Sequence, residues 1–183
     1  MDRDRAPLDS RIIYRGLKID VALRSIELAD GTIGEREFVL HRGAVALVPM
    51  VDRDHVCLVR NHRFAIDRTL LEVPAGSIDV GESPEQTASR ELTEETGYSA
   101  AKMTPLRDWY VTPGVMTERM FLFLCEDLTP GPTDHQLDER LESVIVSWDE
   151  ALAMVHDGRI QDAKSMLSIL LADRHRRQAA PSR

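Results

Sequence analysis

Several features that mark particular protein classes are missing from this chain of 183 residues. The only two cysteines, Cys57 and Cys125, lie in apolar runs, so small buried thiols are expected rather than a disulfide. No stretch approaches the roughly 18 consecutive apolar residues of a membrane span, and the charged residues 1–5 do not resemble a signal peptide. These absences predict a single domain that resides in the reducing cytoplasm.

Basic residues are also in deficit, with 23 lysines and arginines against 31 aspartates and glutamates. The net charge of -8 argues against nucleic acid and against an anionic membrane as partners. The apolar share of 43% and the charged share of 30% are close to those of ordinary globular proteins, so disorder is not expected either.

Apolar periodicity divides the chain into three parts. In residues 1–41, apolar and polar positions mix on either side of Asp30 and Gly31, which predicts an antiparallel β-unit with a hairpin turn. Residues 42–175 predict an α+β domain, an α/β/α sandwich with a central mixed sheet, and residues 176–183 a flexible tail. The expected strands cover residues 43–50, 55–60, 69–73, 106–111, 120–125 and 144–148, and the expected helices cover residues 84–96, 149–156 and 160–174.

One of these helices has clear start and stop signals. Ser83 can cap its first turn, Pro84 suits the first helical position, and Gln86 completes a capping box. Gly97 is the matching C-terminal stop.

The same helix places three carboxylates, Glu91, Glu94 and Glu95, on one flank. Like charges at these spacings destabilise a helix by roughly 0.2–0.5 kcal/mol each, and Arg90 is the only counter-charge within the helix. A solvated acidic face would be the ordinary explanation. A metal–phosphate site is the sharper hypothesis, because Mg²⁺ is usually held by one or two carboxylates, water and substrate phosphates.

Residues 90–98, RELTEETGY, together with Gly76 and Glu82, resemble the signature of the Nudix hydrolases at every fixed position. Only Tyr98 stands where the family usually has a smaller aliphatic residue. The flanking sequence is similar to that of the ADP-ribose pyrophosphatase branch, in which a proline follows the last glycine of the signature by sixteen residues, as Pro113 follows Gly97. The similar flanking segments are residues 71–76, 110–114, 138–142 and 158–165.

This resemblance implies a Nudix-type sandwich that forms a homodimer by exchanging its N-terminal β-unit. It implies hydrolysis of a small nucleoside diphosphate sugar, first ADP-ribose to AMP and ribose 5-phosphate, with Mg²⁺ as cofactor or Mn²⁺ in its place. By resemblance, Glu91, Glu95 and the backbone carbonyl of Ala75 would bind the metal, with Glu94 as a further ligand, and Arg90 would hold the glutamates in place.

Further roles follow from the same resemblance. Arg63 matches a phosphate-contacting arginine, a role that suits its forked guanidinium. Glu72 matches a residue beside the substrate or else braces Arg63, and Pro113 and Gly114 belong to a loop that favours ADP-ribose.

The general base is expected in the loop before the last strand, where the candidates are Glu139 and Glu142. Some relatives place the base two residues before Glu139, but that position is Leu137 here. Another nucleotide sugar such as GDP-mannose, or a dinucleoside polyphosphate, is the alternative substrate. A nucleotide-sugar-sensing module without activity is a further alternative, although such modules typically lose the signature glutamates that this chain retains.

Overall fold

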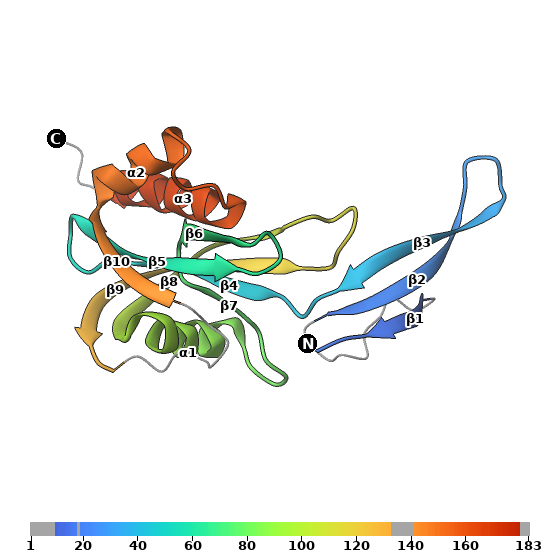
Figure 1. The fold of residues 1–183 in the computed structure, drawn as a ribbon, viewed down its shortest axis with the longest axis horizontal. Coiled ribbons are helices and arrows are strands. Elements are labelled where there is room, and N and C mark those ends of the chain that lie inside the picture. Colours follow the sequence, from blue (N-terminus) through green and yellow to red (C-terminus); the bar gives the residue numbers. More distant parts are fainter. Residues whose placement is uncertain (1–9, 18, 133–140, 180–183) are drawn as a thin grey trace.

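The N-terminal unit is a three-stranded antiparallel sheet that extends away from the rest of the molecule (Figure 1). The computed structural model describes residues 10–17, 19–132 and 141–179. Gly31, with a φ of 79°, lies in the turn between the second and third strands, as the hairpin prediction required. The strands are β1 (Ser10–Arg15), β2 (Asp20–Glu27) and β3 (Ile33–Leu40), in that order across the sheet.

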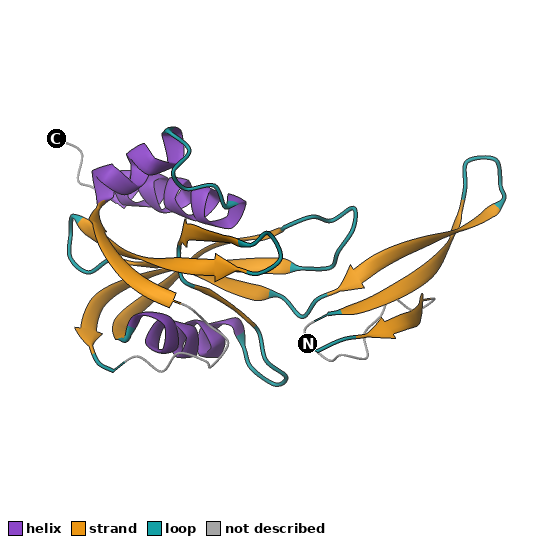
Figure 2. Cartoon of the chain, viewed as in Figure 1, coloured by secondary structure: helices purple, strands orange, loops and turns teal. Residues whose placement is uncertain are grey.

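The rest of the chain is built on two further sheets with helices on both faces (Figure 2). β4 and β9 are parallel and every other pair of strands in these sheets is antiparallel, which confirms a mixed sheet. One sheet has the order β7-β4-β9-β8, with bounds Ala75–Ser77, Ala44–Pro49, Arg119–Pro130 and Tyr98–Tyr110. The other has the order β10-β5-β6, with bounds Leu141–Ser147, His55–Arg63 and Arg68–Glu72.

Strand β4 shows why the body has three layers. Its residues are buried on both faces: Val45 and Leu47 pack with α1 (Pro84–Thr96), whereas Ala46 and Val48 pack in the core beneath the other two helices. Those helices are α2 (Trp148–His156) and α3 (Ala163–Ala179). The predicted α/β/α sandwich is therefore confirmed. No helix in the described ranges is long and apolar enough to cross a membrane.

Several elements have other bounds than the sequence predicted, including β9 and β10, which are longer than expected, and three further differences have a clear explanation or consequence. β8 begins at Tyr98, whereas the sequence predicted a start at residue 106. The earlier start was missed because β8 is an edge strand with no fully buried residue, so its sequence lacks a clear alternation of apolar and polar positions. Pro105 is tolerated there, next to a bulge, because β8 pairs with β9 alone. The short strand β7 was not predicted, and α3 continues through residues 176–179, which were assigned to the tail.

Candidate active site

Helix α1 is positioned by the signals predicted at its two ends. Ser83 accepts a hydrogen bond from the backbone N–H of Gln86 at 3.3 Å, and the Gln86 side chain accepts one from the N–H of Ser83 at 2.8 Å. Gly97 ends the helix in the left-handed conformation with a φ of 72°. These caps set the helical register that carries the acidic flank toward β7.

Two of the predicted carboxylates are buried at the junction of α1 and β7. Glu91 is 6% exposed and Glu95 is 2% exposed. Glu95 Oε2 accepts a hydrogen bond from the N–H of Ala75 at 3.0 Å. The Glu91 carboxylate lies directly on Gly76, where a Cβ atom would stand 1.9 Å from Glu91 Cδ. A glycine is required at position 76 because any side chain would occupy the place of this carboxylate.

Arg90 bridges the carboxylates of the acidic flank. Its Nη1 donates to Glu91 at 2.7 Å and to Glu94 at 3.1 Å, which confirms the pairing with Glu94 indicated by the helical spacing. Its Nε and Nη2 donate to Glu82 at 3.0 and 2.9 Å. The hydrogen bonds from Arg90 lower the pKa of Glu82 to about 2, and the same bonds raise the pKa of Arg90. Asp79 lies 3.7 Å from Nη2, so a single guanidinium faces four carboxylates and the flank keeps a negative charge.

A second charged cluster surrounds Glu72, which is 1% exposed. Arg63 donates to both of its oxygens, from Nε at 2.9 Å and from Nη2 at 2.5 Å. Glu72 therefore braces Arg63, one of the two roles considered from the sequence. The hydrogen bonds to Glu72 raise the pKa of Arg63, and the charge of Glu95 contributes to that rise. The two clusters are linked through the backbone, because Glu95 binds the N–H of Ala75, three residues after Glu72.

Lys164 and Asp162 complete this cluster and were not assigned a role from the sequence. Lys164 Nζ donates to Glu72 and, at 2.7 Å, to Asp162. Burial opposes ionisation of Asp162, but the nearby Lys164 charge and its hydrogen bonds leave the pKa of Asp162 lowered. Their only sequence signal is that they fall in the similar segment 158–165.

Of the two candidate bases, Glu139 and Glu142, the structure describes only the second. Glu139 lies outside the described residues. Glu142 stands opposite Arg60 in the β10–β5 register and pairs with it at 3.2 Å. The adjacent Ser143 points to the other face, where its hydroxyl donates to the backbone carbonyl of Glu95 at 3.3 Å. The structure therefore places Glu142 on the sheet face opposite to α1.

Pro113 and Gly114 lie in the β8–β9 loop, which extends toward the N-terminal unit (Figure 1). The N–H of Val39 donates to the carbonyl of Val115 at 2.8 Å, and the N–H of Thr117 donates to the carbonyl of Val39 at 3.0 Å. These hydrogen bonds place the loop against the end of β3.

Comparison with known proteins identifies the family of this chain. The sequence-family model of the NUDIX domain matches residues 40–168 of this chain. The chain belongs to the Nudix family. This result and the relatives below confirm both the Nudix hydrolase prediction and the resemblance to the ADP-ribose pyrophosphatase branch.

Two relatives and one solved structure illustrate the similarity. The ADP-ribose pyrophosphatase of Bacillus subtilis (strain 168) is 38% identical over 159 residues, which cover 86% of each chain. The methanol dehydrogenase activator of Bacillus methanolicus is 31% identical with the same coverage. A crystal structure of an ADP compounds hydrolase superposes with a TM-score of 0.83 at 25% identity, covering 96% of this chain and 95% of that chain.

Nudix hydrolases generally need a divalent metal, and the carboxylates of the acidic flank are the residues here that could bind one. Within residues 10–17, 19–132 and 141–179, no three acidic, histidine or cysteine side chains form a ready metal site. Mg²⁺ does not require three, because one or two carboxylates with water and phosphate oxygens complete its coordination. The buried Glu91 and Glu95 beside the backbone of Ala75 fit that requirement, with Glu94 available on the same flank.

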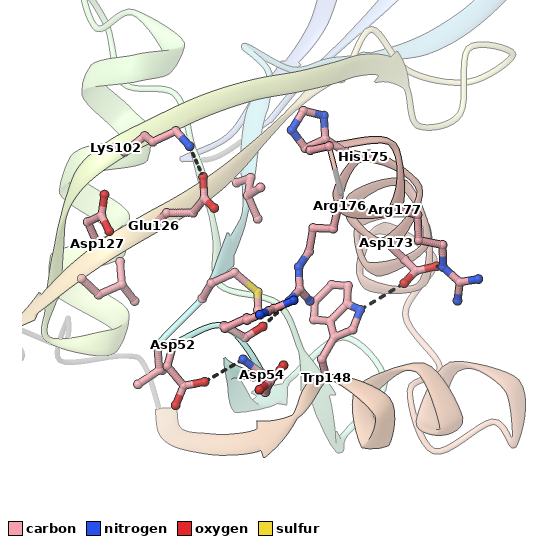
Figure 3. Close-up of a pocket in the computed structure, with 16 residues that line it drawn as sticks. Asp52, Asp54, Lys102, Glu126, Asp127, Trp148, Asp173, His175, Arg176 and Arg177 are labelled. Atoms are coloured by element: carbon pink, nitrogen blue, oxygen red, sulfur yellow. Dashed lines mark hydrogen bonds and ion pairs between the residues drawn. The ribbon is translucent and has the colours of Figure 1, made fainter. Parts of the chain in front are cut away.

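A separate cavity of about 720 Å³ lies between the C-terminal end of α3 and the β4–β5 turn (Figure 3). The Arg176 guanidinium lies 4.5 Å from the centre of the Trp148 ring, and the Trp148 indole N–H donates to Asp173 at 3.1 Å. Lys102 pairs with Glu126 at 2.7 Å on another wall. Arg177 also pairs with Asp173 at 2.7 Å, so several of the charged groups that line this cavity are paired with one another.

Proposed function

We propose that this Nudix protein hydrolyses the pyrophosphate bond of a nucleoside diphosphate sugar, with ADP-ribose as the first substrate and AMP and ribose 5-phosphate as products. One observation carries the proposal: two carboxylates, Glu91 and Glu95, are buried together on α1, and Glu95 binds the backbone three residues after Glu72, the carboxylate that braces Arg63. Carboxylates suit a cation, and an arginine fork suits phosphate oxygens. The 38% identical relative named for ADP-ribose supports the choice of sugar.

In this proposal Glu91, Glu95 and the Ala75 carbonyl would hold Mg²⁺, or Mn²⁺ in its place, and Glu94 would add a ligand. Such an ion would supply neutralisation of the phosphate charge and a lower pKa for the attacking water. Arg63 binds the diphosphate and Glu72 fixes its guanidinium plane. Arg90 contributes to catalysis by fixing the glutamates.

In this proposal the proton of the attacking water passes to a glutamate within residues 138–142. Glu139 is the proposed base, because Glu142 pairs with Arg60 on the face away from α1. A base must come within hydrogen-bonding reach of the proton that it removes.

We also propose that residues 1–41 are exchanged between two copies of the chain in a cytoplasmic homodimer. The N-terminal unit leaves large apolar side chains in solvent, including Tyr14, Leu17 and Ile33, which are 59%, 93% and 70% exposed. Exposed apolar groups gathered on one unit mark an interaction surface. Light scattering should give twice the chain mass, and replacing Tyr14 and Ile33 with serine should shift it toward the monomer. A monomeric wild-type chain would contradict the exchange.

The activity is tested by incubating the protein with ADP-ribose and Mg²⁺ and following AMP by chromatography. Glu95→Gln is the matched variant, since its side chain can still accept the Ala75 hydrogen bond but lacks the charge. AMP release by the wild type and its loss in Glu95→Gln are expected. Equal activity in both proteins would refute the metal site.

A panel with GDP-mannose and a dinucleoside polyphosphate, compared by kcat/KM, ranks the substrates. ADP-ribose should give the highest value if Pro113 and Gly114 help to select it. Binding of ADP-ribose without cleavage of any compound in the panel would instead identify a sensing module.

A further inference from the structure

Lys164 is an almost buried cation in the Glu72 cluster. Its side chain is 13% exposed, and its ammonium group donates to Glu72 and to Asp162. A lysine buried this far is stabilised only where its charge is paired, and here both partners are carboxylates.

The Glu72 carboxylate is shared between two cations. Its Oε1 accepts from Arg63 Nε, whereas its Oε2 accepts both from Arg63 Nη2 and from Lys164. This bidentate pairing uses Nε and Nη2 of Arg63. Among the described residues it leaves Nη1 as the guanidinium nitrogen that can donate to another anion. Lys164 also shares the negative charge of Glu72, which Arg63 would otherwise balance alone.

The start of α3 fixes the backbone that carries Lys164. Asp162 accepts a hydrogen bond from the N–H of Ser165 at 3.0 Å, as a helix cap does. Ser165 Oγ in turn accepts one from the N–H of Val73 at 2.9 Å. Because Val73 directly follows Glu72, these contacts hold the lysine at a fixed distance from its carboxylate.

We propose that Lys164 is a positioning residue for phosphate recognition, which acts by sharing the Glu72 carboxylate so that Arg63 stays oriented with Nη1 free for the diphosphate. The inference rests on the proposed function, because it assumes that Arg63 binds phosphate. Lys164 itself need not contact the substrate. Its removal should leave Glu72 paired with Arg63 alone and draw the guanidinium inward.

A double-mutant cycle between Lys164 and Arg63 tests this role. Lys164→Met should raise KM for ADP-ribose about tenfold and change kcat less than about threefold, as expected for lost substrate positioning. Lys164→Arg should restore most of the loss, because it keeps the charge. In an Arg63→Ala background, Lys164→Met should have almost no further effect on KM. The control Lys102→Met removes a lysine of another Lys–Glu pair, with 60% side-chain exposure, and should leave KM unchanged.

Two outcomes would overturn the inference. One is the same increase in KM from Lys164→Met with and without Arg63, and the other is a fall in kcat with KM unchanged. Thermal unfolding of each variant separates loss of fold from loss of positioning, and Lys164→Arg supplies the folded comparison if Lys164→Met unfolds.

If the wild type cleaves no nucleotide sugar, the proposed function fails by itself. The cycle is then repeated on the binding of magnesium pyrophosphate by calorimetry. Non-additive losses would still support the link from Lys164 to Arg63, whereas additive losses would refute it.

Discussion

Replacing Gly76 with alanine tests the geometry of the acidic flank most directly. The added Cβ would stand 1.9 Å from Glu91 Cδ and Oε1 and 2.4 Å from Oε2. Ordinary contacts begin at 3.4 Å, so the carboxylate must retreat by about 1.5 Å. The obstacle is the end of a side chain rather than backbone, so Glu91 can move without unfolding the protein.

That movement has two separable consequences. Glu91 is buried and bonded to Arg90 at 2.7 Å, so crowding it should cost about 1–3 kcal/mol, typical of overpacking. For a domain of this size, the cost corresponds to a decrease in Tm of about 3–10 °C. A misplacement of about 1 Å in a catalytic group costs on the order of 100-fold in rate, so kcat/KM should fall by about that factor. The loss of activity should greatly exceed the loss of folded protein at the assay temperature.

The assay compares Gly76→Ala with Gly131→Ala. At position 131, among the residues that the structure describes, an added Cβ would meet the carbonyl oxygen of Gly97 alone, at an ordinary 3.4 Å. Both variants are measured for ADP-ribose hydrolysis over a range of Mg²⁺ concentrations and for Tm. Gly76→Ala should need more Mg²⁺ and remain slow at saturation, whereas Gly131→Ala should match the wild type.

A Gly76→Ala variant that kept kcat/KM within about threefold of the wild type, with an unchanged Mg²⁺ requirement, would contradict this prediction. Such a result would mean that the position of the Glu91 carboxylate on Gly76 does not matter for the reaction. Equal losses in Gly76→Ala and Gly131→Ala would point instead to a general sensitivity to added methyl groups.

Three further predictions follow from other parts of the structure. Glu142→Gln should keep kcat within about threefold, because Glu142 faces away from α1; a loss of 100-fold or more would return it to the role of base. The pKa of Glu82 is lowered from 4.5 to about 2 by Arg90, so this pair stabilises the protein fully above about pH 4.5 and progressively less toward pH 2. Urea unfolding should therefore show the wild type losing its advantage over Glu82→Gln across that range, and a constant difference would contradict the pairing. Burial raises the pKa of Cys57 to about 11 and that of Cys125 to about 12, so neither thiol should react with Ellman's reagent at pH 7.5 until the protein unfolds; rapid labelling of the folded protein would contradict their burial.

Local signals in the sequence were sufficient to predict α1 and its flank. Its bounds, residues 84–96, its capping box and the left-handed Gly97 all depend on side chains within a few residues of the helix ends. The burial of Cys57 and Cys125 was likewise evident from their apolar neighbours, because strands covered on both faces are apolar throughout.

Contacts between distant segments could not be predicted in this way. Glu72 and Lys164 are 92 residues apart and meet only because α3 begins where β6 ends. The periodicity of apolar residues is a local signal and does not predict a contact between such distant residues. The orientation of Glu142 was hidden for a related reason: the face on which a strand residue lies depends on the register of β10 with β5, and a shift of one residue would reverse it. The first part of β8, before residue 106, was missed because an edge strand does not need an apolar period.

The contacts of the β8–β9 loop connect the proposed dimer with the proposed choice of substrate. Thr117 Oγ1 accepts a hydrogen bond from the N–H of His41 at 2.9 Å and lies 3.1 Å from the carbonyl of the same residue, to which it donates. His41 directly follows β3, so the loop that contains Pro113 is fastened to the N-terminal unit at its base. If that unit is exchanged between two copies, the dimer interface fixes the loop as well. Removing the Thr117 hydroxyl should then alter the preference between ADP-ribose and GDP-mannose more than it alters the rate on either, because the carboxylates of α1 do not depend on this contact.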